Sequence, residues 1–258
     1  MKFQNYVRNE YGKCDLPSNT VCKIKGGFRK LELDVEYAPF QVSDNIYWGR
    51  IWIDSIRIVC NGKGITPELA EASAYAELAE RFSAGLFYPV FEERVRFNIP
   101  ALYNEQTNRF LNYEWMDGYV HAHQDELQEN ILRIEDLLAN ERHLTDTDIE
   151  HIKNSRMARH WVDGFSITRE ETVKVPVNFV TYIHASNGMA AGNTMEEAMI
   201  QASCEIFERH AQIQIIKPEK TVPTIDPDSV NNAVIQDMIK FYQRNKVDVI
   251  IKDLSFGG

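Results

Sequence analysis

The 258-residue sequence has no apolar run that approaches the roughly 20 residues a membrane-spanning helix needs. Its first residues, MKFQNYVRNEYGK, also lack the apolar stretch of a secretory signal peptide. These two absences predict a soluble, cytoplasmic protein without a membrane partner.

Several common chemistries lack their sequence signatures. Four cysteines, Cys14, Cys22, Cys60 and Cys204, show no CxxC or Cys/His spacing, so neither a structural zinc site nor a disulfide framework is expected. The motifs GxxxxGK[ST], HExxH and GxSxG are missing too, which argues against P-loop nucleotide binding, zinc peptidases and α/β-hydrolases. His121 and His123 resemble a metal pair, but without a third ligand we interpret them as ordinary solvated histidines.

Basic clusters are scarce as well. The formal net charge is −10 and the isoelectric point is near 5.2. A nucleic-acid-binding face would appear as clustered lysine and arginine, so we expect no nucleic-acid partner.

Two stretches share one pattern, in which a glycine-rich turn runs into an acidic helix that ends in ExxER. They are GKGITPELAEASAYAELAER, residues 62–81, and NGMAAGNTMEEAMIQASCEIFER, residues 187–209. A shift of 128 positions superimposes Gly64 on Gly192, Thr66 on Thr194, Glu68 on Glu196, Ala70 on Ala198, Glu77 on Glu205, Glu80 on Glu208 and Arg81 on Arg209. We interpret this as an internal repeat.

Each repeat has a helix start signal. Thr66 and Thr194 are candidate N-caps, Pro67 suits a first turn, and Glu197 completes a T-x-x-E capping box that predicts a helix beginning at about Met195. In the second helix, the apolar face with Ile200 and Phe207 is expected to pack, and the opposite face presents carboxylates.

Two such helices, packed as halves of one domain, would gather several carboxylates and two arginines. Each like-charge pair at about 4 Å costs roughly 4 kcal/mol at an effective dielectric of 20, so a cation is required. Oxygen ligands suit Mg²⁺ and arginine suits phosphate, which predicts a Mg·nucleotide site. The alternatives left open are ordinary i,i+4 surface pairs for each ExxER, a purely structural capping box for Glu197, and a solvated turn for Lys63, which could otherwise reach a phosphate.

The remaining patterns predict an α+β fold with mixed sheets and an internal pseudo-twofold repeat of strand, glycine-rich turn and acidic helix. Alternation predicts strands over Arg29 to Val35, Ile51 to Cys60, Phe165 to Ile167, Val173 to Ala185 and Val247 to Leu254, the last of them buried. Gly26 and Gly27 are expected to form a turn and residues 61–64 a loop. Helices are expected over residues 126–144, 146–159 and 231–245.

With the motifs in view, the sequence resembles the YcaO family, whose members bind ATP and activate peptide-bond oxygens. The resemblance rests on GKGITPELAEASAYAELAERFSA, SNGMAAGNTMEEAMIQASCEIFERHA, and WVDG followed by VPVNFV. It covers roughly Gly26 to the end and looks closest to the enterobacterial branch. It implies one incomplete domain over residues 1–258, with a first half at 28–119, a helical insertion at 120–164 and a second half at 165–258.

The resemblance also implies a ligand set. Mg²⁺ would be held by Glu77, Glu80, Glu197, Glu205 and Glu208. The nucleotide, ATP, would be contacted by Ser73, Arg81, Asn193 and Arg209, with Lys63 as a further candidate. The implied chemistry is phosphorylation of a backbone amide oxygen, giving an azoline or a thioamide, and no catalytic residue is assigned.

The sequence departs from the family at both ends. Family members open with a helix that gives a lysine and a serine to the nucleotide, and neither is placed before Lys30. The family domain continues past the position of Gly258, which predicts a C-terminally truncated domain. The expected partners are a peptide or protein substrate and a protein for substrate delivery or methylthiolation. A homodimer, an accessory or scaffold role without chemistry, and a purely structural role for the repeats stay open.

Overall fold

The computed structural model describes residues 4–56, 58–83, 103–104, 109–110, 118–128, 130–139, 141 and 143–255. They form two compact units, which are described separately. Unit 1 comprises Met1–Ala84 and Asn187–Gly258, and unit 2 comprises Gly85–Ser186. Across the described residues, no helix combines the length and apolar character needed to cross a membrane.

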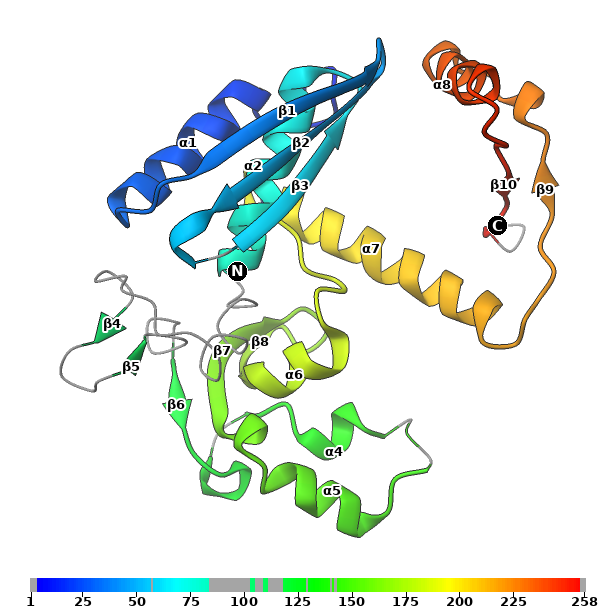
Figure 1. The fold of residues 1–258 in the computed structure, drawn as a ribbon. Helices are drawn as coiled ribbons and strands as arrows, with labels where there is room; N and C mark the ends of the chain where they lie inside the picture. The colour runs from blue at the N-terminus through cyan, green and yellow to red at the C-terminus, as the bar shows by residue number, and fades with distance from the viewer. Residues whose placement is uncertain are drawn as a thin grey trace. The chain divides into compact units, whose positions relative to one another are not determined.

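Unit 1 begins with an α/β layer (Figure 1). Helix α1 (Pro17–Lys30) precedes the hairpin strands β1 (Glu36–Ser43) and β2 (Ile46–Ile53), the short helix η1 (Asp54–Ile56) and β3 (Ile58–Gly64). The strands form an antiparallel sheet in the order β1-β2-β3, and helix α2 (Pro67–Ser83) packs mainly against β3.

The core of this layer lies between the sheet and α2. Alternate residues of β2 and β3 are buried, because every second side chain of a strand points to the same face. They meet the small and apolar residues of α2, and the buried set is Ile51, Ile53, Ile58, Cys60, Ala70, Ala74, Tyr75 and Leu78.

The rest of unit 1 follows Asn187. Helix α7 (Met195–Ile216) is 22 residues long and is followed by β9 (Thr224–Ile225), η5 (Pro227–Ser229), α8 (Ala233–Arg244) and β10 (Ile251–Lys252). Strands β9 and β10 pair antiparallel, and the Asn232 side chain caps α8 by accepting from Ile235 N. The expected helix over residues 231–245 is therefore confirmed.

Unit 2 contains a second small sheet, β6 (Val120–His121), β7 (His160–Ser166) and β8 (Glu171–Pro176), in the order β6-β7-β8. Its helices α4 (Ile134–Leu137), α5 (Asp146–Lys153) and α6 (Val177–His184) meet around the buried residues Ile134, Leu138, Ala158 and Phe179. Its remaining elements are β4 (Tyr103–Asn104), β5 (Arg109–Phe110), η3 (Gln124–Glu126) and η4 (Arg156–Arg159).

The fold is α+β, as predicted, but several element predictions near the N-terminus are wrong. Gly26 and Gly27 lie inside α1, and the predicted strand from Arg29 begins there as helix. Pro17 starts this helix, and Val21 and Phe28 are buried along it, so tertiary packing outweighs the low helix propensity of glycine. Residues 61–64 continue β3 and do not form a loop.

Three later predictions are also wrong. The predicted helix over 126–144 contracts to η3 and α4, because Leu132 N donates to Lys174 O and Lys174 N to Asn130 O, which draws this stretch alongside β8. The strand predicted over Val173 to Ala185 ends at Pro176, and the chain continues from Val177 as helix α6. The predicted buried strand to Leu254 shortens to β10 and its approach is exposed, with Ile250 at 72%.

Candidate functional site

The two repeated helices begin with the same local geometry. Thr66 Oγ1 accepts a hydrogen bond from Leu69 N, and Thr194 Oγ1 accepts one from Glu197 N, each at 3.2 Å. Both predicted N-caps are thus confirmed, and α7 begins at Met195 as expected.

The glycine before each cap is required by close approach. A Cβ on Gly64 would lie 2.5 Å from Ala70 N, and one on Gly192 would lie 2.4 Å from Ala198 N. Only glycine lets the turn pack this tightly on the first turn of its helix. The two stretches therefore share a local structure, and the twofold relation between the halves stays a prediction.

Both ExxER segments form the same ion pairs. Arg81 lies 3.7 Å from Glu77 and 3.5 Å from Glu80, measured between side-chain nitrogen and oxygen atoms. Arg209 lies 3.6 Å from Glu205 and 3.3 Å from Glu208. In each helix, one arginine thus pairs with two carboxylates and offsets one of their two negative charges.

The charge of a carboxylate on α7 acts on a carboxylate of α2. Burial raises the pKa of Glu80, Arg81 opposes that rise, and the charges of Glu205 and Glu77 add to it. The Ala191 N–H, in the glycine-rich turn before α7, donates to Glu80 and lowers its pKa in part. Glu80 of the first acidic helix is therefore influenced by the turn before α7 and by one carboxylate of α7.

Glu197 is bound by the N-terminal segment and does not close the predicted capping box. Its Oε2 accepts from Cys14 N at 3.2 Å and from Asn193 Nδ2 at 3.3 Å, and its Oε1 lies 3.3 Å from Lys13 Nζ. Burial alone would raise the pKa of Glu197, but the Cys14 N–H and the Lys13 ammonium hold it below the ordinary value. The carboxylate side chain is only 10% exposed.

Two of these residues were missed from the sequence. Lys13 reaches Glu197, and Thr20 on α1 donates to Asn193 Oδ1 at 2.7 Å. Neither residue was named as a candidate from the sequence. Pro17 at the first position of α1 was the available signal, because it marks a helix start close to both.

Two predicted residues stand apart from these contacts. Ser73 is exposed on α2, four and seven positions before Glu77 and Glu80, which places it on their side of the helix. Lys63 is exposed on β3, whose buried residues alternate with it and face α2. The structure thus does not bring Lys63 to the carboxylates.

The donor set suits a hard divalent cation, although the carboxylates already have partners. In the part of the chain that the structure describes, no three acidic, histidine or cysteine side chains are placed to hold a metal ion. Mg²⁺ binds through few carboxylates and takes phosphate oxygens for the rest of its shell. The residues therefore fit Mg²⁺ delivered together with phosphates.

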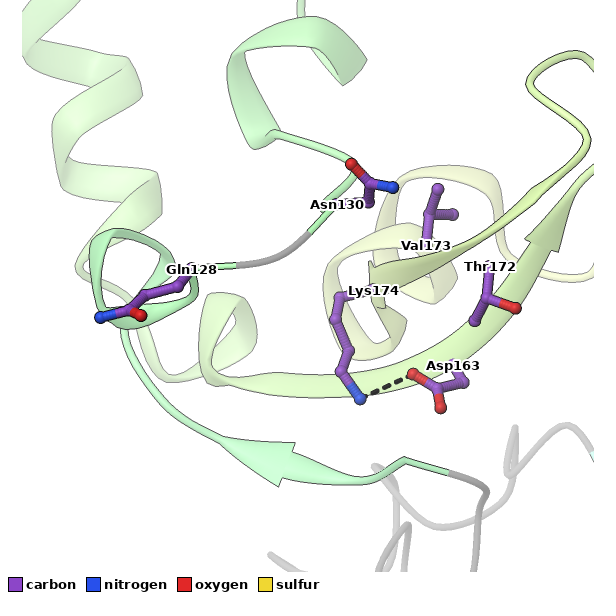
Figure 2. A pocket seen from close by; sticks show the side chains of 6 residues that line it. All are labelled: Gln128, Asn130, Asp163, Thr172, Val173 and Lys174. Carbon is purple, nitrogen blue, oxygen red and sulfur yellow. Dashed lines mark hydrogen bonds and ion pairs between the residues drawn. The ribbon is translucent and has the colours of Figure 1, made fainter.

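A hollow in unit 2 has different chemistry (Figure 2). It has a volume of about 570 Å³ and is lined by Gln128, Asn130, Asp163, Thr172, Val173 and Lys174. Lys174 Nζ is already bound to Asp163 Oδ1 at 2.6 Å and to Gly118 O. No candidate site residue lines this hollow.

The His121 and His123 pair gains a neighbour, and among the described residues neither histidine belongs to a group that could hold a metal ion. His121 is paired with His160 across β6 and β7, and their ring centroids are 5.0 Å apart. His160 Nδ1 bonds to the Tyr119 hydroxyl at 3.1 Å, and His123 caps η3 by accepting from Asp125 N.

Fold and site together define an α+β domain with two acidic helices that share a threonine N-cap and the ExxER ion pairs, and Lys13 pairs with Glu197 on the second of them. The family model described as YcaO cyclodehydratase, ATP- and Mg²⁺-binding, matches residues 61–258. The chain belongs to the YcaO family.

Two curated relatives are similar over 77% of this chain. The ribosomal protein S12 methylthiotransferase accessory factor YcaO of Escherichia coli K12 is 28% identical over 204 residues, and an uncharacterized protein of Haemophilus influenzae is 29% identical over 206. In both cases the match covers 33% of the relative. The chain thus spans about a third of the length of these relatives.

Two solved structures share the fold. YcaO from Methanopyrus kandleri, bound with AMPPCP and Mg²⁺, has a TM-score of 0.57 at 21% identity and covers 90% of this chain and 52% of its own. A heterocyclase in complex with substrate and cofactor has a TM-score of 0.64 at 19% identity and covers 99% of this chain and 35% of its own.

Proposed function

We propose that this chain is part of a Mg²⁺-dependent ATP-binding enzyme that activates a backbone amide oxygen of a peptide or protein by phosphorylation. The observation that carries the proposal is that α2 and α7 each pair one arginine with two carboxylates in the same ExxER pattern. The charge of Glu205 on α7 also contributes to raising the pKa of Glu80 on α2. Two repeats that are distant in sequence would then supply one acidic site. Family membership supports the choice of ATP and Mg²⁺.

The roles follow from charge. The carboxylates of Glu77, Glu80, Glu197, Glu205 and Glu208 would hold Mg²⁺. Arg81 and Arg209 carry fork-shaped donors that match phosphate oxygens, and Lys13 adds a point charge. Asn193, Thr20 and Ser73 offer polar contacts to the nucleotide. We do not include Lys63, because its side chain belongs to the face of the sheet opposite α2.

The proposed reaction exchanges one amide oxygen for a nucleophile. A thiol, hydroxyl or sulfide adds to the carbonyl carbon, and the carbonyl oxygen takes the γ-phosphoryl group of ATP, releasing ADP. The C–O bond then breaks, so this oxygen leaves in inorganic phosphate. An azoline forms when a thiol or hydroxyl nucleophile and the amide nitrogen each lose one proton, which leaves a C=N bond. A thioamide forms when the sulfur of hydrogen sulfide loses both of its protons and is left as C=S. Cyclodehydration and thioamidation both follow this balance, and ribosomal protein methylthiolation is a process that such a modification could support.

In a second candidate function, the protein binds the nucleotide at the same site but catalyses no reaction. The Escherichia coli relative is named an accessory factor, which favours a nucleotide-responsive scaffold. The two proposals differ in one product. An ¹⁸O-labelled amide in the modified peptide yields ¹⁸O-labelled phosphate only if the amide oxygen is phosphorylated.

The first test is calorimetric titration of Mg·ATP into the 258-residue chain and into the double variant Glu77→Gln, Glu205→Gln. We expect binding by the chain and its loss in the variant, because one carboxylate is removed from each helix. Glu71→Gln is the matched control, since Glu71 lies on α2 but pairs with Lys25 of α1 at 3.1 Å. Equal binding by chain and double variant, or none by the chain, would refute the proposal.

A further inference from the structure

The segment that carries Lys13 has a defined shape. We call residues 4–15 the N-terminal strap. Asn9 organises it, because its Oδ1 accepts from Tyr11 N and Lys13 N, each at 3.0 Å, and its Nδ2 donates to Asp15 O at 2.8 Å. An asparagine that bonds to nearby backbone in this way fixes a turn. Lys13 therefore projects from an ordered loop.

The N-terminal strap is attached to the first turn of α7. Gln4 N donates to Glu196 Oε1 at 2.8 Å, and Cys14 N donates to Glu197 Oε2. Lys13 Nζ occupies the other oxygen of Glu197. Both oxygens of this carboxylate are thus engaged by the strap.

An ammonium at 3.3 Å from a carboxylate oxygen competes with a metal for that oxygen. Mg²⁺ would need to approach to about 2.0–2.1 Å, so Lys13 has to move before Glu197 can become a ligand. The other proposed ligands on α2 and α7 are paired with Arg81 and Arg209. A metal ion that binds without nucleotide must displace these cations from the carboxylates, and no phosphate is then present to bind the displaced cations.

A nucleotide changes this balance, because its phosphates are alternative anionic partners for lysine and arginine. We propose that Lys13 is a tethered counter-cation that keeps Glu197 from binding a divalent metal until nucleotide phosphates draw the ammonium away. This inference rests on the proposed function and names its order of assembly. Metal and nucleotide then bind synergistically, and the coupling is reciprocal.

The test measures metal and nucleotide separately in the intact chain. Mn²⁺ alone is titrated and followed by electron paramagnetic resonance, and Mg·AMPPNP is titrated by calorimetry. Lys13→Met should raise the affinity for Mn²⁺ alone at least about fivefold, the low end of typical coupling, and lower the affinity for Mg·AMPPNP. Loss of a merely structural lysine would not move the two affinities in opposite directions. Lys13→Arg should stay close to the parent chain in both.

Lys23→Met is the matched control, because Lys23 pairs with Asp15 at 2.6 Å and lies outside the Glu197 contacts. We expect it to leave both affinities unchanged. The inference would be overturned if Lys13→Met bound Mn²⁺ no more tightly than the parent chain. This includes the outcome in which neither protein shows detectable binding. The Mn²⁺ titration tests the role of Lys13 in the absence of nucleotide. Its failure is therefore distinct from a failure of Mg·ATP binding, which would refute the proposed function itself.

Discussion

At the scale of single residues, the glycines of this chain differ in what they do. Gly192 packs its backbone on the start of α7, where a Cβ would lie 2.4 Å from Ala198 N, whereas Gly26 sits in α1 with nothing within 4 Å of a Cβ. The first is a steric requirement. The second only lowers helix propensity.

This contrast predicts opposite signs for the same substitution. Gly26→Ala should raise the free energy of unfolding by about 1 kcal/mol, the usual helix-interior difference. Gly192→Ala should lower it by about 1–3 kcal/mol, because backbone atoms must move apart. Urea unfolding followed by circular dichroism measures both, and a stabilised Gly192→Ala would contradict the described turn.

At the scale of elements, α7 has an unexpected distribution of burial. Its apolar side, expected to pack, is exposed, with Phe207 at 73% and Ile200 at 49%. Within α7, all of which the structure describes, Ile215 is the buried residue. The apolar pattern correctly predicted a helix but not its buried side.

Two alanine substitutions on this helix test that distribution. Phe207→Ala should change the free energy of unfolding by less than about 0.5 kcal/mol, as exposed positions do. Ile215→Ala should cost about 2 kcal/mol or more, because it leaves a cavity. Thermal or urea unfolding at low protein concentration gives both values. A larger loss at Phe207 than at Ile215 would show that this face is covered.

Prediction from sequence succeeded where structure is set locally. The Thr66 and Thr194 caps, the helix starts and the ion pairs within ExxER all involve residues within four positions of each other. Prediction from sequence failed where contacts between residues far apart in the chain determine the structure. The bond of Thr20 to Asn193 spans 173 positions, and the pairing of residues 130–132 with Lys174 replaced a predicted helix. No periodic pattern within one segment encodes such partners.

At the scale of the whole molecule, the proposed site lies entirely in unit 1. Nucleotide binding should therefore protect α2 and α7 and leave α4 and α5 of unit 2 unchanged. Hydrogen exchange with and without saturating Mg·ATP would detect this, since ligand at 100 times its Kd stabilises the bound state by about 2.7 kcal/mol. Protection confined to α4 and α5 would move the site to the other unit.

Because unit 2 lies between the two parts of unit 1 in the sequence, the two acidic helices are synthesised at different times. Glu77 and Glu205 are separated by 128 residues, so at about 5–20 residues per second the second acidic helix is made about 6–25 s after the first. During that interval α2 has no α7 beside it, and unit 2, which lies between them in the chain, is complete before α7 is made. Any slow codon or pause between the repeats would prolong the life of a half-formed acidic site.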